Sequence, residues 1–144
     1  MLEFDDALKC IMTFAAETTN EKVKIQNSLG RYLANPVLGR IDLPPFSKSA
    51  MDGFAIRANE RSSEFRMEET LAAGVAPAKS VGEGQCSRIM TGAMIPPGAD
   101  MVVKVENTTV TEAETMRIRA RENGRNIIHK GENLRAGDVS LDPR

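Results

Sequence analysis

Aromatic residues are the scarcest component of this sequence. Its 144 residues include no tryptophan, one tyrosine and five phenylalanines. Aliphatic side chains and eight methionines must therefore fill the core, and we expect modest independent stability and some apolar surface that another part of an assembly covers. No apolar run approaches the ~20 residues of a membrane-spanning helix. Residues 1–20 show no cleavable signal pattern, so we expect a cytoplasmic protein without membrane contact.

Cysteine and histidine are also scarce. Cys10 and Cys86 are far apart and form no Cys-x-x-Cys pair, which favours free thiols in a reducing compartment over a disulfide or a zinc site. His129 is the only histidine, so a packed or surface position is favoured over a metal-ligand role. A glycine-rich phosphate loop, a Ser-His-Asp set and a Cys-His pair are missing. The sequence holds no complete catalytic constellation, which fits a site completed by another domain or subunit.

Charge of either sign is almost balanced, with 19 basic and 20 acidic residues and a net charge of −1. This balance argues against a dedicated nucleic-acid binder. One stretch, residues 117–135, holds six bases against the two acids Glu122 and Glu132. It either attracts an anionic, phosphate-bearing substrate or forms a solvated strand face, and the second alternative is favoured because no aromatic or glycine-rich cradle accompanies it. The six bases are Arg117, Arg119, Arg121, Arg125, Lys130 and Arg135.

Short apolar stretches separated by glycine and proline predict a mainly β fold with an N-terminal helical segment, of the α+β class. Apolar residues at helical spacing, among them Phe4, Leu8 and Ile11, predict a helix over residues 3–16. We expect a short strand at 22–26 and a short helix at 28–34. Further strands are predicted at 37–43, 54–56, 65–71, 85–90, 100–105, 108–110, 115–120, 126–129 and 139–141, with hairpin turns at 112–114 and at Asn123-Gly124.

The predicted elements divide the chain into two small lobes. Residues 1–51 would form an outer layer that carries the N-terminal helix. Residues 52–125 would form an inserted β lobe, and residues 126–144 would return to the outer layer.

The polar loop within residues 43–57 is the first candidate site. Two prolines stiffen its entry, and Ser47, Ser49 and Asp52 place hydroxyls and a carboxylate on one short segment. Asp52 could bind a hard cation such as Mg²⁺ or position a water. The alternative is that Asp52 caps a local turn, since Asp before Gly is a common turn signal. The two serines could donate to phosphate oxygens or simply close the loop.

A second candidate segment, Thr91-Gly92-Ala93, lies between two predicted strands, and its small residues permit close approach to the backbone. It could form a ligand-facing loop at a subunit junction or a plain hairpin connection. Glu106 follows the predicted strand at 100–105 and could reach a ligand. A surface ion pair, with Lys104 as partner, is the favoured role for Glu106.

Three segments in the same order, residues 42–55, 88–103 and 124–138, resemble the motifs of the MoeA-type molybdenum insertases (molybdopterin molybdenumtransferases), a family that includes the E domain of gephyrin. The resemblance implies irregular, branching β-sheets in two parts. It also implies that the intact protein is much longer, with an α/β domain that holds the pterin site and that this chain lacks. The fragment alone would then be inactive.

The same resemblance implies an enzyme that inserts molybdate into adenylylated molybdopterin and releases AMP, with Mg²⁺ or a similar divalent cation. It further implies a homodimer whose subunits share the site. Asp52 would place the cation or the nucleotide phosphate, and Thr91 would line the cleft that faces the partner subunit. The substrate-binding residues would be Ser47, Ser49, Met51, Gly92, Glu106 and Asn133.

Asn133 departs from the family pattern. The family has an acidic residue after Gly-Glu, whereas this chain reads Gly-Glu-Asn. Asparagine keeps an oxygen ligand but loses the charge, so a cation site shared by two carboxylates would be weakened unless the adjacent Glu132 substitutes. Two other hypotheses stay open: a non-catalytic dimerisation and scaffolding module of the same family, and a generic β-rich ligand-binding module.

Overall fold

The computed structural model describes residues 3–14, 19–111, 114–121 and 123–143. The chain forms two compact units, residues 1–36 with 141–144 and residues 37–140. The first unit contains the helix α1 (Phe4–Thr13) and the 3₁₀ turn η1 (Ile25–Asn27). The strands are β1 (Val37–Leu38), β2 (Lys48–Ser49), β3 (Gly53–Ile56), β4 (Glu64–Leu71), β5 (Gln85–Ile89), β6 (Met101–Lys104), β7 (Thr108–Val110), β8 (Thr115–Ile118), β9 (Ile127–Ile128) and β10 (Val139–Leu141), with the 3₁₀ turn η2 (Val105–Asn107) between β6 and β7.

The predicted N-terminal helix at 3–16 is confirmed over Phe4–Thr13; Glu3 and Phe14 flank the observed helix as its caps, and residues 15–16 lie outside the described part of the chain. Asp5 and Asp6 in its first turn favour the helix dipole. None of its residues is buried. The predicted strand at 22–26 and helix at 28–34 are wrong: a single 3₁₀ turn forms at 25–27 instead. The hydroxyl of Ser28 donates to the Ile25 carbonyl at 2.7 Å, a local bond that favours a turn over a helix or a strand.

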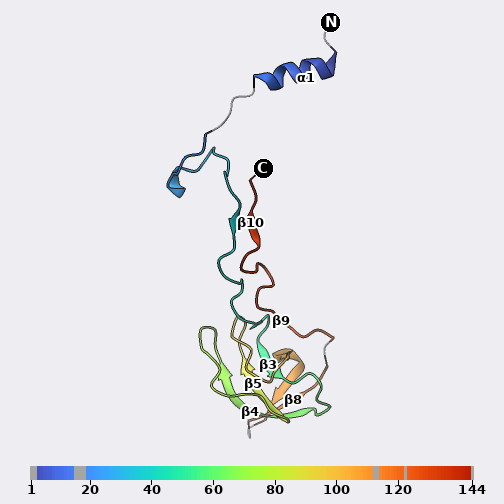
Figure 1. Cartoon of the computed structure of the whole chain (residues 1–144). Helices are drawn as coiled ribbons and strands as arrows, with labels where there is room; N and C mark the ends of the chain where they lie inside the picture. The colour runs from blue at the N-terminus through green and yellow to red at the C-terminus, as the bar shows by residue number, and fades with distance from the viewer. Residues whose placement is uncertain (1–2, 15–18, 112–113, 122, 144) are drawn as a thin grey trace. The chain divides into compact units, whose positions relative to one another are not determined.

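Six strands form one curled sheet in the order β6-β3-β5-β4-β8-β7, in which β3, β5, β4 and β8 lie side by side (Figure 1). Only the β4–β5 pair is parallel among these neighbours. All four residues of β3 are buried, because the sheet has an apolar cluster on each face. One cluster contains Phe54, Ile56, Phe65, Cys86, Val103 and Met116, and the other contains Ala55, Leu71, Ile89, Ala93 and Val102.

Most of the predicted strands are confirmed. The alternation in β4 places Phe65 and Leu71 inside, and β7 pairs with β8 as an antiparallel hairpin whose residues 112–113 lie outside the described part. The predicted strand at 37–43 is mostly wrong, because only residues 37–38 form a strand and Leu43 makes an isolated bridge to Leu134.

The predicted hairpin at Asn123-Gly124 is wrong as well. β9 pairs with β2 rather than with β8. The positive φ, 54°, occurs at Asn126, where the side-chain amide donates to the Val102 carbonyl at 2.8 Å. This bond ties the chain to the edge strand β6 in place of a local turn.

The fold class is thus confirmed: the chain is mostly β with one N-terminal α-helix, and the described residues contain no α/β layer. The strands of the curled sheet all lie between residues 53 and 118, while the division at residues 52 and 125 stays a prediction. No described helix is long and apolar enough to cross a membrane.

Candidate functional site

Asp52 and Thr91 meet at the surface of the unit formed by residues 37–140. The backbone N–H of Thr91 donates to Oδ1 of Asp52 at 2.6 Å, and the Thr91 hydroxyl donates to the same oxygen at 2.8 Å. Both residues are exposed. Among the described residues nothing donates to Oδ2 of Asp52, so this oxygen is available to a ligand.

Backbone hydrogen bonds bring the two candidate loops together. Ser49 N–H donates to the Ala93 carbonyl at 2.9 Å, and Gly92 N–H donates back to the Ser49 carbonyl at 2.8 Å. Ile95 N–H donates to the Ser47 carbonyl at 3.0 Å. The loops are therefore paired like short strands, which fixes Asp52 opposite Thr91.

Two glycines permit this arrangement. A Cβ on Gly53 would lie 2.0 Å from the Val103 carbonyl oxygen, so only glycine lets β3 approach β6 directly after Asp52. Gly92 has φ +82°, a left-handed conformation that glycine adopts without strain. The turn that follows Thr91 depends on this conformation.

The predicted serines already have partners within the chain. Ser49 is fully buried; its hydroxyl donates to the Met51 carbonyl at 2.5 Å and accepts from Met51 N–H at 3.3 Å. The Ser47 hydroxyl accepts from Lys130 N–H at 3.2 Å. These contacts favour the loop-closing alternative for both serines. Met51 is 41% exposed beside Asp52, where its side chain is accessible to a ligand.

Glu106 is exposed on η2, next to the same loop. The preceding residue, Val105, donates its N–H to the Asp52 carbonyl at 3.1 Å. The structure therefore brings Ser47, Ser49, Met51, Asp52, Thr91, Gly92 and the turn with Glu106 into one region.

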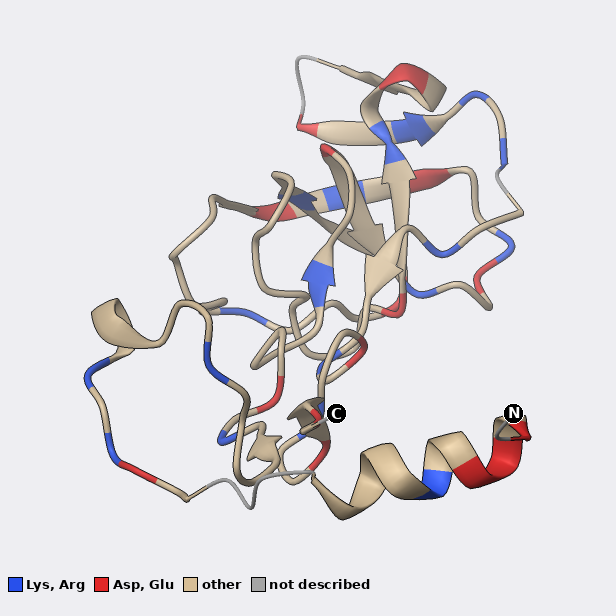
Figure 2. Ribbon diagram, turned by 90° about the horizontal axis from the view of Figure 1, so that it is seen from above, with Lys and Arg blue, Asp and Glu red and all other residues tan. Residues whose placement is uncertain are grey.

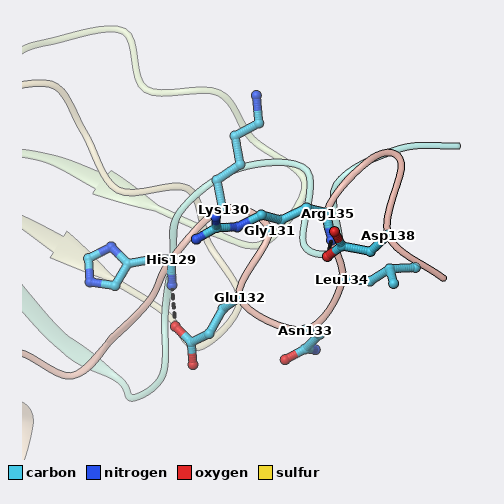
Figure 3. A pocket seen from close by; sticks show the side chains of 8 residues that line it. All are labelled: His129, Lys130, Gly131, Glu132, Asn133, Leu134, Arg135 and Asp138. Atoms are coloured by element: carbon cyan, nitrogen blue, oxygen red, sulfur yellow. Dashed lines mark hydrogen bonds between the residues drawn. The ribbon is translucent and has the colours of Figure 1, made fainter. Parts of the chain in front are cut away.

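Asn133 belongs to a separate groove of about 500 Å³. The groove is lined by His129, Lys130, Gly131, Glu132, Asn133, Leu134, Arg135 and Asp138 (Figure 3). Asn133 N–H donates to the Leu43 carbonyl at 2.9 Å, while its side-chain amide forms no hydrogen bond with any described residue. Glu132 accepts from His129 N–H at 2.7 Å, and Lys130 points to the opposite side of the loop (Figure 3).

Asp42 organises this groove and was not predicted as a site residue. Its Oδ1 accepts from Ala136 N–H at 2.9 Å, and its Oδ2 lies 3.4 Å from Nζ of Lys130. The Ala136 hydrogen bond and the charges of Lys130 and Arg135 hold the pKa of Asp42 below its usual value against the opposing effect of desolvation. Only its place directly before Leu-Pro-Pro hinted at this role.

The basic stretch at 117–135 is largely paired within the chain. Arg117 contacts Glu64 at 2.6 Å, and Arg125 contacts Asp100 at 3.0 Å. Arg121 donates to the Ser62 carbonyl at 2.8 Å. Figure 2 shows basic and acidic residues interspersed along the ribbon of this unit. These pairs support the solvated strand face over a dedicated anion patch.

The electrostatics at Asp52 keep its carboxylate ionised. The Thr91 backbone N–H lowers the pKa of Asp52 most, followed by the Thr91 hydroxyl, and the positive charge of Arg88 lowers it further; desolvation opposes these effects. Cys86 behaves in the opposite way, because burial, with a contribution from the negative charge of Glu68, raises the pKa of its thiol to about 12. Cys86 is thus a core residue rather than a nucleophile.

Asp52 alone does not provide a complete set of protein ligands for a metal ion. Within the described ranges, no group of three or more His, Cys, Asp or Glu side chains could hold a metal ion. Mg²⁺, however, is commonly held by one or two carboxylates together with substrate phosphates and water. An exposed carboxylate with one free oxygen fits a cation of that kind.

The chain is similar to one protein family and to several known proteins. The family described as MoeA N-terminal region (domain I and II) matches residues 2–144. The chain is 37% identical over 143 residues to a molybdopterin molybdenumtransferase of Staphylococcus epidermidis, covering 94% of this chain and 34% of that protein. It is 35% identical over 148 residues to the protein of the same name from Bacillus subtilis, covering 95% and 34%.

A solved structure is also similar. The molybdopterin biosynthesis moeA protein from Pyrococcus horikoshii OT3 superposes with a TM-score of 0.74 at 32% identity, over 85% of this chain and 34% of that one. The chain thus spans about a third of the length of the relatives that it matches.

Proposed function

Because the chain belongs to the family of MoeA N-terminal regions, we propose that the intact protein inserts molybdate into adenylylated molybdopterin and releases AMP. The names of the relatives, molybdopterin molybdenumtransferase, support this reaction class. This chain corresponds to only about a third of those relatives, so the pterin site would lie on a part of the intact protein outside these 144 residues. We further propose that the protein acts in the cytoplasm, where its two free cysteines suit a reducing compartment.

The exposed Asp52 carboxylate carries the proposal. Thr91 occupies one of its oxygens and orients the group, which leaves Oδ2 free to receive a ligand. The carboxylate would hold Mg²⁺ together with substrate phosphate oxygens, and the cation would neutralise charge on the phosphate. Thr91 orients the carboxylate, and Met51, Gly92 and Glu106 border the region that a substrate would enter.

The shared site of a homodimer is part of the same proposal. Asp52 and Thr91 lie at the surface, where both side chains are exposed. A pterin-binding domain of a partner subunit would cover this surface and complete the site. The loop of residues 129–135, which includes Asn133, contacts the Ser47 loop through the Lys130 N–H and would border the substrate from that side.

Substitution of Asp52 in the full-length protein tests the proposal directly. Asp52→Ala and Asp52→Asn should lower the rate of AMP release and molybdenum insertion at least ~100-fold, as loss of a group that acts on the reacting phosphate does. Glu83→Gln is the matched control, because Glu83 is exposed and lies elsewhere on the unit. Circular dichroism should show that all variants remain folded. Normal turnover by both Asp52 variants would remove this residue from the site.

Asn133→Asp restores the charge that the family has at this position. If the groove of residues 129–135 takes part in cation binding, this variant should bind Mg²⁺ more tightly in the presence of substrate than the wild type does. An unchanged Mg²⁺ dependence would separate Asn133 from the cation.

A second candidate function is a non-catalytic dimerisation module. The observation that favours it is the exposed apolar surface of the first unit, where Phe4, Ile11, Ile25, Leu29 and Tyr32 are each at least 67% exposed. Such side chains are typical of a surface that a partner covers. Sedimentation of this 144-residue chain tests it: a dimer at micromolar concentration supports the module, and a monomer contradicts it.

A further inference from the structure

Arg88 lies in β5, between β3 and β4 in the curled sheet. It is the register partner of Phe54 on β3 and of Thr70 on β4. Side chains directly opposite each other in an antiparallel pair share one face of the sheet. Phe54 is buried in that face while Arg88 is exposed, so Arg88 lies where the face reaches the surface. Two neighbouring strands hold its backbone in place.

Arg88 is close to the candidate site along both strands. Asp52 stands two residues before Phe54, the register partner of Arg88, and Thr91 follows Arg88 by three residues. The positive charge of Arg88 is near enough to lower the pKa of Asp52. The two side chains nevertheless form no ion pair with each other.

The guanidinium of Arg88 is exposed in the described part of the chain. It forms no hydrogen bond and no ion pair with any residue that the structure describes, whereas Arg66, Arg117 and Arg125 each contact a carboxylate. A guanidinium presents parallel N–H donors that match the oxygens of a phosphate or another tetrahedral oxyanion. An arginine that has no partner among the described residues and lies beside an ionised carboxylate suits a ligand that carries both an anion and a cation.

We propose that Arg88 binds a tetrahedral oxyanion of the substrates, the phosphate of the adenylylated pterin or the molybdate ion, next to the cation held at Asp52. This inference rests on the proposed function and adds a substrate-binding residue to it. Asp52 would face the positive part of the ligand and Arg88 its negative part. Because the two side chains form no ion pair with each other, the Arg88 guanidinium and Oδ2 of Asp52 are both available to the ligand.

The test uses the full-length protein with Arg88→Gln and Arg88→Lys. Arg61→Gln is the matched control, because Arg61 is exposed, has no side-chain partner among the described residues, and lies beyond the opposite end of β3 from Asp52. The KM for adenylylated molybdopterin, the KM for molybdate and kcat are measured for each variant, at low and high NaCl.

For Arg88→Gln we expect one KM to rise about tenfold or more, the effect of losing a charge-assisted hydrogen bond, while kcat changes less than threefold. Arg88→Lys should recover part of the loss because it keeps the charge but not the planar donors. The substrate whose KM rises identifies the oxyanion. The salt dependence of kcat/KM should weaken in Arg88→Gln and stay unchanged in Arg61→Gln.

Two results would overturn the inference: both KM values within twofold of wild type, or a fall in kcat without a rise in either KM, which would make Arg88 a positioning residue for Asp52. Calorimetric titration of the full-length variants with AMP plus Mg²⁺, and separately with molybdate, provides a readout that needs no turnover. If wild-type protein binds either probe and Arg88→Gln binds it at least tenfold more weakly, Arg88 is an oxyanion ligand even where the proposed reaction fails. Equal binding by the two proteins contradicts the inference.

Discussion

Thr91 makes two separate hydrogen bonds to one oxygen of Asp52, and only one of them comes from its side chain. Thr91→Val removes the hydroxyl and keeps the backbone N–H, the shape and the β-branched backbone preference. We therefore expect the pKa of Asp52, which now lies below its ordinary value of 3.8, to rise part of the way back. The carboxyl carbon signal of Asp52, followed by NMR through an acid titration, measures this shift.

The sign of the linked stability follows from the direction of the pKa. A carboxylate whose folded pKa is lowered stabilises the native state above its unfolded pKa, and that contribution is lost as the pH falls through the folded value. Thr91→Val raises the folded pKa of Asp52. The stability that the ionised carboxylate contributes should therefore be lost at a higher pH than in the wild type. Thr109→Val, an exposed change on β7, is the control. An Asp52 titration identical in Thr91→Val and wild type would contradict the role of the hydroxyl.

At the scale of single residues, the sequence shows which side chains could act in a site better than it shows which residues they contact. Asp52 and Thr91 could be singled out because each lies in a loop between apolar runs, and the structure places them in contact. Arg88 and Asp42 could not, because their significance depends on which residues stand across a strand pair or a loop contact. The Arg88–Phe54 register and the Asp42–Ala136 bond join residues 34 and 94 positions apart.

At the scale of elements, β3 and its first residue determine where the site loop begins. Gly53 pairs with both β5 and β6, and a Cβ there would meet the Val103 carbonyl oxygen at 2.0 Å and the Val103 carbonyl carbon at 2.9 Å. The Val103 backbone pairs with β3 in the sheet, so it cannot move aside without breaking hydrogen bonds between β3 and β6. We expect Gly53→Ala to lower the free energy of unfolding by about 2 kcal/mol or more, the size of other backbone-strain effects.

Denaturant unfolding followed by circular dichroism measures this change. Gly124→Ala is the matched control, because a Cβ at Gly124 would have no neighbour nearer than 3.8 Å, the side-chain oxygen of Asn126. Its stability should stay within about 0.5 kcal/mol of wild type. If the two alanine variants had equal free energies of unfolding, β3 and β6 would be able to move apart without loss of stability, and the prediction would be wrong.

The elements that the sequence predicts well are those whose hydrophobic pattern is complete within the element. The alternation in β4 and the β7–β8 hairpin are of this kind, since each is paired with a neighbour close in sequence or packs on one clear face. The hairpin turn predicted at Asn123-Gly124 does not form, because the Asn126 side chain bonds to β6 instead. The strand predicted at 22–26 and the helix predicted at 28–34 do not form, because the side chains of Ser28 and Arg31 bond to nearby carbonyls and favour a turn.

At the scale of the whole molecule, the site is an outcome of contacts between distant segments. Lys130 N–H reaches the Ser47 hydroxyl, and β2 pairs with β9 some 80 residues later. Val105 N–H reaches the Asp52 carbonyl from η2. No local sequence pattern specifies these contacts, which bring together the motifs at 42–55, 88–103 and 124–138.

The helix α1 has no buried residue, and its apolar side chains are exposed. Phe4, Leu8 and Ile11 follow helical spacing and are 79%, 47% and 67% exposed, an arrangement that exposes a continuous apolar stripe to water. If a second copy covers this stripe in the proposed homodimer, Leu8→Glu and Ile11→Glu in the full-length protein should weaken dimerisation at least tenfold. Burying an unpaired charge in an apolar interface has a cost of that order or larger.

Sedimentation equilibrium measures the dimer dissociation constant of each variant. Lys9→Glu is the control, since Lys9 is an exposed helix residue whose only ion pair is with Asp6 among the described residues. If dimerisation supplies the second half of the site, AMP release by the Leu8 and Ile11 variants should fall at low protein concentration and recover at high concentration, whereas Asp52→Ala stays inactive at both. Dimerisation that is equally strong in all three variants would exclude the α1 stripe from the interface.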